Sequence, residues 1–528
     1  MDPTQEVLLE IPEQPEAVRS TPISIPETAA RAPKLKPIDR SQGLLRPVIV
    51  DELVGPDHKV RAVWDLTGAL DLSGFLEKIK SREGRAGSSA WDPRLLVSVW
   101  LYSYSEQVSS AREISRLMEY EPGLMWLSGL GEVNYHTLAD FRAAHEKELK
   151  GLLAELLGML SKEGFVKLDL VAHDGTKIRS QAGADSFRRE GTLEKETAKA
   201  QQMMEEIERA AAAREREGEG KTRREAARER AARERAERMK LAGEELRKIR
   251  ESKRSQKERE EARVSLSEPE ARVMKHGDGA IAPSYNLQLS TDAEKTVVVG
   301  LQLTQCSSDS GSLLPAMDEV KEMMGQYPKQ GVADGAYTNH AAIVGMEERQ
   351  VEFYGSLSTA EARQAGAMKA AGIDPRFGAQ AFTYDAEKRT LECPAGKALD
   401  YVRQSQKRGE TYQQFQAQET DCKACLFRTP CCPPGTEARL ISIRITEKAE
   451  VAAFRAKMET PEAKQIYRKR GPTAEFPNSW IKEKLGIRKF RLRGLAKARV
   501  EALWGVLTYD VMQWIRLSWR GKQAAAAA

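Results

Sequence analysis

Two aspartates follow apolar segments with the alternation of β-strands. Asp174 lies in "LVAHDGTKI" and Asp334 in "GVADGAYTN". An Asp-Gly pair in this setting is more simply a turn signal, so neither aspartate by itself indicates chemistry. Two carboxylates at the ends of two strands of one sheet, however, would repel each other unless a cation lay between them. Mg²⁺ prefers oxygen ligands, and two such ions can promote cleavage of a phosphodiester.

A third carboxylate is expected on a helix near basic residues, and Glu475 in "YRKRGPTAEFPNSWIK" is the best candidate. Glu475 and Lys482 are seven residues apart, which predicts that they share one helix face. Tyr467 and Arg470 are three apart and are predicted to share a face of the preceding helix, before a glycine and a proline break it. The segment therefore offers a carboxylate, two cations and a phenol to one phosphodiester.

More basic residues follow in "IRKFRLRG". They are Arg488, Lys489, Arg491 and Arg493. Interleaved with an aromatic side chain, they are typical of a track along a nucleic-acid backbone. We expect them to contact DNA phosphates, which carry no sequence information.

The elements that must position these residues begin after a tail. Residues 1–42 are rich in Pro, Glu, Thr and Ser and are predicted to be disordered. Residues 43–165 have a helical period and form an all-α N-terminal domain. "DPRLLVSVWLYSY" begins with Asp92 as N-cap and Pro93 at the first helical position, and "NYHTLADFRAAHEKELKGLLAELLGMLSKEG" reads as one long helix. A helix-turn-helix DNA-binding domain and an ordinary helical bundle both fit this pattern.

The period then changes to two, and strands alternate with helices. Residues 166–187, 264–357 and 441–528 together predict an α/β core, a mixed sheet with helices packed on it. An insertion at 188–263 is rich in Ala, Glu, Arg and Lys and predicts a charged helical hairpin broken at "EGEGK". A pair of solvated helices and a basic arm along DNA phosphates are both open readings of this insertion.

A second insertion, 358–440, contains five of the six cysteines. Cys422 and Cys425 form a Cys-x₂-Cys pair, whose thiolates can converge on zinc across a tight turn. Cys393 and either Cys431 or Cys432 would complete four ligands; the set we select is Cys393, Cys422, Cys425 and Cys431. Because a second Cys-x₂-Cys pair is missing, reduced thiols without metal are the alternative.

The whole chain has 528 residues and a net charge of +5, which permits a nucleic-acid partner without requiring one. It has no apolar run of about 20 residues that could span a bilayer and no signal-peptide pattern. We therefore expect a cytoplasmic, nucleoid-associated protein without membrane contact.

Taken together, these motifs resemble those of bacterial insertion-sequence transposases of the DDE type. The resemblance extends over roughly residues 45 to 520 and depends on Asp174, Asp334 and the pattern Tyr467, Arg470, Glu475, Lys482. It implies a ribonuclease-H-like core whose first strand carries one aspartate, whose fourth carries the other, and whose late helix carries the glutamate. It also implies that Asp174, Asp334 and Glu475 are catalytic and hold two Mg²⁺ ions, with Mn²⁺ as a substitute.

The implied reaction is cleavage of double-stranded DNA at the ends of an insertion sequence, followed by joining of the 3′-hydroxyls to target DNA. Two ends imply a homodimer on DNA. A domesticated, non-catalytic DNA-binding relative and a general nuclease of the same fold are the alternatives. The spacing from Arg470 to Glu475 is one residue longer than is commonest, and Phe-Pro-Asn after Glu475 departs from the usual pattern.

Overall fold

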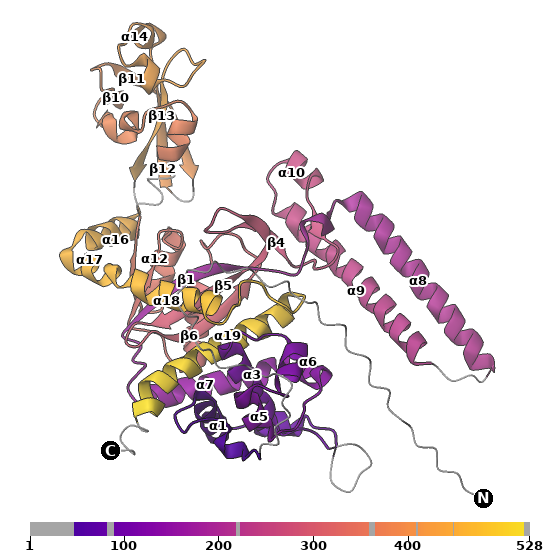
Figure 1. The fold of residues 1–528 in the computed structure, drawn as a ribbon. Coiled ribbons are helices and arrows are strands. Elements are labelled where there is room, and N and C mark those ends of the chain that lie inside the picture. Colours follow the sequence, from indigo (N-terminus) through magenta and orange to yellow (C-terminus); the bar gives the residue numbers. More distant parts are fainter. Residues whose placement is uncertain are drawn as a thin grey trace, which may run out of the picture. The chain divides into compact units, whose positions relative to one another are not determined.

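A six-stranded mixed sheet is the centre of the structure (Figure 1). Its strands are β1 (Leu170–Arg179), β4 (Arg272–Lys275), β5 (Ile281–Asp292), β6 (Val297–Thr304), β7 (Gln330–Ala333) and β8 (Glu352–Gly355). The order across the sheet is β4-β5-β1-β7-β8, and β6 also pairs with β5. The computed structural model describes residues 47–81, 89–217, 222–357, 365–407, 410–446 and 448–521. The predicted tail, 1–42, and most of the "EGEGK" break lie outside these ranges.

The directions of the strands match the ribonuclease-H-like expectation, and the predicted fold class is confirmed. β1 is antiparallel to β5 and parallel to β7, and β7 is parallel to β8. Helices α11 (Leu313–Met324) and α12 (His340–Glu348) occupy the connections that parallel neighbours require. Asp174 is on β1, and Asp334 comes directly after β7.

The prediction that the first strand ends at His-Asp-Gly is wrong. β1 begins at Leu170 and continues through Asp174 to Arg179. Beyond His173 it loses β7 as a partner but keeps β5, since Asp174 pairs with Leu289 and Arg179 with Ser284. The long antiparallel partner extends the strand past a dipeptide that would otherwise favour a turn.

The N-terminal region is helical, as predicted. Its helices are α1 (Lys59–Ala69), α2 (Ser73–Glu77), α3 (Pro93–Ser105), α4 (Ala111–Leu117), α5 (Pro122–Ser128), α6 (Tyr135–Ala144) and α7 (Glu146–Lys162). Asp92 caps α3, as expected, by accepting a hydrogen bond from the backbone N–H of Arg94. The predicted long helix is two helices, because His145 leaves the helical conformation between α6 and α7.

Helix α19 (Leu495–Trp514) connects the helical region with the sheet. It packs against α3, α7 and β6, and the indole N–H of Trp504 donates to the carbonyl of Arg142 at 3.2 Å. The sequence assigned this segment to the catalytic core alone. In the structure it contributes to both, and contacts join residues 49–528 into one compact unit.

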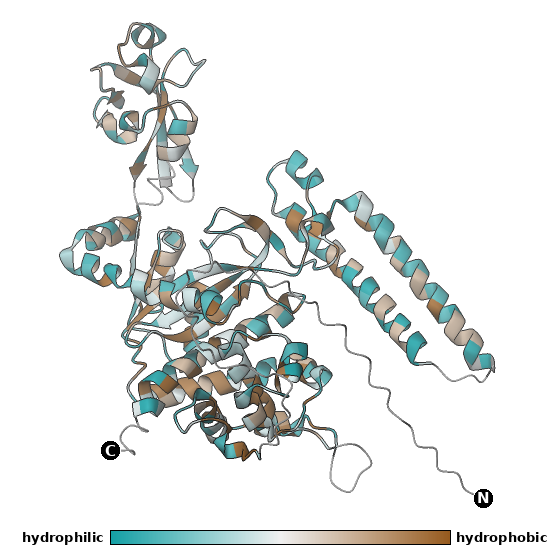
Figure 2. Ribbon diagram, in the orientation of Figure 1, coloured by the Kyte–Doolittle hydropathy of each residue, from teal (hydrophilic) through white to brown (hydrophobic). Residues whose placement is uncertain are grey.

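The charged insertion forms the predicted helical hairpin, with α8 (Glu190–Glu217) against α9 (Arg223–Glu251), followed by α10 (Gln256–Glu260). β2 (Phe187–Arg188) and β3 (Val264–Ser265) pair at its base. Much of both helices is hydrophilic in Figure 2. The hairpin is tied to the sheet by Glu245, which is buried and pairs with Arg272 and accepts from Gln305 at 3.1 Å.

The cysteine-containing insertion has a sheet of its own, in the order β13-β12-β11-β10-β9. Its strands are β9 (Thr383–Asp385), β10 (Thr390–Glu392), β11 (Ala398–Lys407), β12 (Glu410–Ala417) and β13 (Leu440–Thr446), with short helices α14 (Glu419–Lys423) and α15 (Arg428–Cys431). The insertion extends past the predicted boundary at 440, because β13 pairs with β12.

Three helices lead from this insertion to the expected third carboxylate: α16 (Ala449–Glu459), α17 (Pro461–Arg468) and α18 (Arg470–Glu483). Arg470 therefore begins α18 and does not share a helix with Tyr467, contrary to the prediction. The break comes at Lys469, two residues before the predicted Gly471. Pro472 is accommodated in the first turn of α18, where its missing N–H would have no helical partner.

Candidate active site

Asp174 and Asp334 come together at the end of the parallel pairing between β1 and β7. The last paired residues are His173 and Ala333, so each aspartate is the next residue of its chain. Asp334 starts a tight turn, and its carboxylate accepts a hydrogen bond from the backbone N–H of Ala336 at 2.7 Å. The two aspartates predicted from the sequence thus belong to one site.

The surroundings of Asp174 disfavour its charge. Burial, assisted by the nearby carboxylate of Asp334, raises the pKa of Asp174 to about 6. The backbone N–H of Gly175 and the guanidinium of Arg470 act in the opposite direction. A buried carboxyl with a second carboxylate beside it is an arrangement that a cation would stabilise.

Tyr467 and Arg470 lie beside the same carboxylates, although they are on different helices. Burial raises the pKa of the Tyr467 phenol, and the charge of Asp334 adds to this effect. Arg470 lowers it through its charge and a hydrogen bond. The predicted phenol and guanidinium are therefore both at the site.

Glu475 lies at its margin. Its side chain is 68% exposed, and its carboxylate is 3.7 Å from the Arg470 guanidinium. Among the residues that the structure describes, no group of three or more His, Cys, Asp or Glu side chains is arranged to hold a metal ion. The expected carboxylate triad is present in sequence, but in this conformation Glu475 is connected to the two aspartates through Arg470.

The α18 side chain that contacts Asp174 is Asn478, which the sequence analysis missed. Its Nδ2 donates to Oδ2 of Asp174 at 3.1 Å. Lys482, one turn further along α18, is half-buried; burial lowers its pKa, and the charge of Asp174 opposes this effect. The spacing offered a signal for Asn478, because a residue four before Lys482 shares its helix face.

A buried polar network lies beside Asp174 and includes a fourth carboxylate, Asp309, which the sequence analysis also missed. Asp309 accepts hydrogen bonds from Lys177 at 3.0 Å, Asn286 at 2.6 Å and Gln288 at 2.9 Å. Burial opposes its ionisation, but hydrogen bonds from Asn286 and Lys177 outweigh it, so the pKa of Asp309 is lowered. Its loop, "CSSDSGS", has no periodicity or motif that could have indicated this role.

Gln288 connects the Asp309 network to β1 and to the turn that follows β7. Its carbonyl oxygen accepts from the hydroxyl of Tyr337 at 2.7 Å and lies 3.0 Å from Nε2 of His173. His173 also contacts Ser290 at 3.0 Å and is buried. These contacts give His173 a structural role in the sheet.

The predicted basic track is on the segment between α18 and α19. All four of its side chains are exposed: Arg488, Lys489, Arg491 and Arg493. The segment lies along the end of β1, because Lys489 forms a bridge with Arg179. Arg488 is paired with Glu483, and Arg491 donates to Ser109 at 2.6 Å.

Five cysteines gather in the second insertion. The sulfurs of Cys393, Cys422 and Cys425 each accept a backbone N–H, at 3.4, 3.5 and 3.4 Å. Burial raises the pKa of Cys431, and the other three thiols add to the effect. Burial and the thiols of Cys422 and Cys431 likewise raise the pKa of Cys432, to about 12. The thiols are close, but zinc binding stays a prediction.

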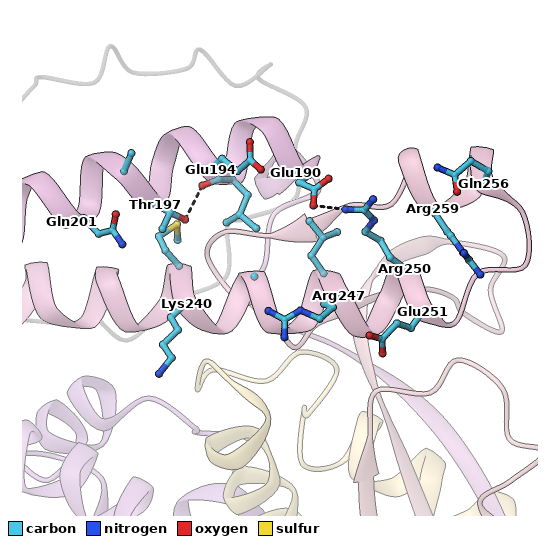
Figure 3. Close-up of a pocket in the computed structure, with 15 residues that line it drawn as sticks. Glu190, Glu194, Thr197, Gln201, Lys240, Arg247, Arg250, Glu251, Gln256 and Arg259 are labelled. Carbon is cyan, nitrogen blue, oxygen red and sulfur yellow. Dashed lines mark hydrogen bonds and ion pairs between the residues drawn. The ribbon is translucent and has the colours of Figure 1, made fainter.

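A cavity of about 830 Å³ lies elsewhere, between the base of α8, α9 and α10. Figure 3 shows charged side chains at its rim, including the pair Glu190 and Arg250. It contains none of the predicted site residues. Trp480 of α18 packs edge-on against Tyr509 of α19, with ring centroids 5.3 Å apart.

Comparison with protein families gives two matches. Residues 392–514 match the family described as "Transposase DDE domain", and residues 48–144 match "Transposase domain (DUF772)". The first match contains Glu475 and the gathered cysteines but neither Asp174 nor Asp334. No curated protein matches the chain. In the described residues, no helix is long and apolar enough to cross a membrane.

Proposed function

The chain is a transposase of the DDE type, and on this premise we propose that it cleaves DNA at insertion-sequence ends and joins the 3′-hydroxyls to target DNA. The observation that carries the proposal is the adjacency of Asp174 and Asp334 at the end of the β1–β7 pairing. A DNA-binding scaffold has no need of two repelling carboxylates beside a guanidinium.

The two aspartates are a suitable donor set for a divalent cation. Their oxygens are the ligands that Mg²⁺ and Mn²⁺ accept, and the raised pKa of Asp174 reflects burial and repulsion that a cation would relieve. Glu475 would be the third carboxylate, connected to the pair through Arg470. When bound, two such ions would activate the attacking oxygen and stabilise the leaving one.

The chain's own cations would hold the scissile phosphate. Arg470 lies between the aspartates and Glu475 and offers a guanidinium to two phosphate oxygens. Lys482 is half-buried near Asp174 and supplies a point charge. Tyr467 can donate its phenol proton to a phosphate oxygen. Holding the phosphate in a fixed orientation speeds the reaction, because the reacting atoms are already aligned.

Double-stranded DNA at the element ends and at the target would be the partner, with the exposed Arg488, Lys489, Arg491 and Arg493 following its backbone. Because two ends are processed together, we propose a homodimer on DNA. Support for a DNA partner comes from both transposase family matches.

The test is a cleavage and strand-transfer assay with Mg²⁺ and DNA that carries the sequences flanking the gene. Asp174→Asn and Asp334→Asn should each abolish cleavage, because an amide lacks the required charge. Asp169→Asn is the matched control, since Asp169 is exposed and paired with Lys329 away from the site. Cleavage that survives either active-site substitution would reject the proposal. Equal cleavage of unrelated DNA would instead indicate a general nuclease, and binding without cleavage a domesticated scaffold.

A further inference from the structure

Asn478 occupies a position that helix packing alone does not explain. It is 7% exposed, on the face of α18 that meets β1, and its Nδ2 donates to Asp174. Asparagine is a poor residue for a helix interior, and Pro477 beside it removes a backbone donor. An apolar residue would pack there at less cost, which suggests that the amide has another role.

The other half of the amide has no partner. Oδ1 of Asn478 is buried and accepts no hydrogen bond. Leaving a buried acceptor unpaired costs about 1–3 kcal/mol. Asn478 contacts the carboxylate of Asp174. An ionised carboxylate only accepts hydrogen bonds, so it cannot be the partner of Oδ1 of Asn478. The missing partner must therefore be a donor or a cation.

A phosphate of the DNA does not fit this requirement, because its oxygens only accept hydrogen bonds. A divalent cation does fit, since amide carbonyl oxygens are hard ligands of the kind that Mg²⁺ and Mn²⁺ take. Half a turn of the amide about its last side-chain bond exchanges Oδ1 and Nδ2, and the two atoms are sterically nearly equivalent. This rotation would bring Oδ1 toward Asp174 without moving α18.

We propose that Asn478 is a metal ligand of this site. Its amide oxygen would coordinate a divalent cation together with the carboxylate oxygens of Asp174 and Asp334. The inference rests on the proposed function and adds a residue to it. Helix α18 would then contribute to the site through Asn478, which already contacts Asp174 and lies one turn beyond the exposed Glu475.

The experiment measures Mn²⁺ binding to the full-length protein without DNA, by the electron paramagnetic resonance signal of free Mn²⁺. Asn478→Ala should weaken binding by about tenfold or more, within the range seen when groups around a metal are removed. Asn478→Asp should bind Mn²⁺ at least as tightly as the wild type, because a carboxylate oxygen replaces the amide oxygen. Ser479→Ala, at the exposed neighbouring position, is the matched control and should bind normally.

Thermal melting of each variant without metal establishes that it is folded. Unchanged Mn²⁺ affinity in folded Asn478→Ala would overturn the inference. Loss of Mn²⁺ binding in folded Asn478→Asp would also overturn the inference. Aspartate keeps an oxygen ligand but lacks the N–H group that donates to Asp174, so such a loss would mean that Asn478 acts only as a hydrogen-bond donor. Asp174→Asn separates this failure from that of the proposed function. If Asp174→Asn binds Mn²⁺ normally, the proposed metal site is wrong. If Asp174→Asn does not bind Mn²⁺ but Asn478→Ala binds it normally, only the proposed role of Asn478 is wrong.

Discussion

Gln288 lies so close to Gly175 that no side chain larger than hydrogen fits between them. A Cβ atom on Gly175 would clash with Nε2 of Gln288 and would lie 2.9 Å from the Tyr337 hydroxyl and 3.0 Å from Oδ1 of Asp309. Gln288 cannot simply move away, because it is hydrogen-bonded to both of these groups. The glycine after Asp174 therefore serves close packing under the site and does not form a turn.

Gly175→Ala should lower the free energy of unfolding by about 1–3 kcal/mol, the usual cost of overpacking, and should slow DNA cleavage. Gly151→Ala is the control, because a Cβ at Gly151 in α7 meets nothing within 4 Å and alanine should stabilise the helix. Denaturant unfolding and the cleavage assay together test this. Wild-type stability and activity in Gly175→Ala would contradict the prediction and would show that Gln288 and its partners can move to make room for a methyl group.

Lys482→Ala should weaken binding to end DNA and unrelated DNA about equally, because a lysine contact to phosphate carries no sequence information. The salt dependence of binding should flatten by about 0.9 for the one lost phosphate contact, and cleavage should slow. Lys484→Ala, at an exposed position two residues on, should have a smaller effect on cleavage. If Lys482→Ala kept the salt slope but lost discrimination between the two DNAs, Lys482 would read bases.

Asp510 in α19 should make the protein less stable as pH rises. It is fully buried; Oδ1 accepts from the backbone N–H of Val298 at 2.9 Å, and Oδ2 has no partner. Burial raises the pKa of Asp510 well above its usual value. The folded state therefore holds a proton that the unfolded chain releases, and the associated stability is lost as pH rises from the unfolded pKa through the folded one.

Asp510→Asn keeps the shape without the charge and should raise the melting temperature at pH 8, with a difference that shrinks toward pH 4. Asp57→Asn, at an exposed position, should leave the pH profile unchanged. A melting series from pH 4 to 8 tests both. Equal melting temperatures of Asp510→Asn and the wild type throughout this range would contradict the prediction.

Zinc in the second insertion remains a prediction with a direct measurement. If Cys393, Cys422, Cys425 and Cys431 bind zinc, protein purified under reducing, zinc-replete conditions should contain about one equivalent. The double substitution Cys422→Ser and Cys425→Ser should remove the metal and lower stability. Cys306→Ser is the control, because Cys306 is exposed and outside the insertion. Metal-free protein by mass spectrometry would support the reduced-thiol alternative.

The sequence by itself determined the features that depend on local pattern. Alternating apolar residues indicated a strand at each of Asp174 and Asp334, and Asp92 with Pro93 marked the start of α3. The charged composition of residues 188–263 indicated a helical hairpin. These signals are local because strand alternation, helix caps and helix propensity act within a few residues.

Only the tertiary structure decided which side chains meet. β1 continues past Asp174 because β5, more than a hundred residues away, pairs with it. α18 turns Asn478 and not Glu475 toward Asp174 because its Ala474 and Ile481 pack inward. A helical spacing restricts residues to one face, but the neighbouring sheet selects which edge of that face is buried. The composition of the site is therefore set by long-range packing, which no local pattern encodes.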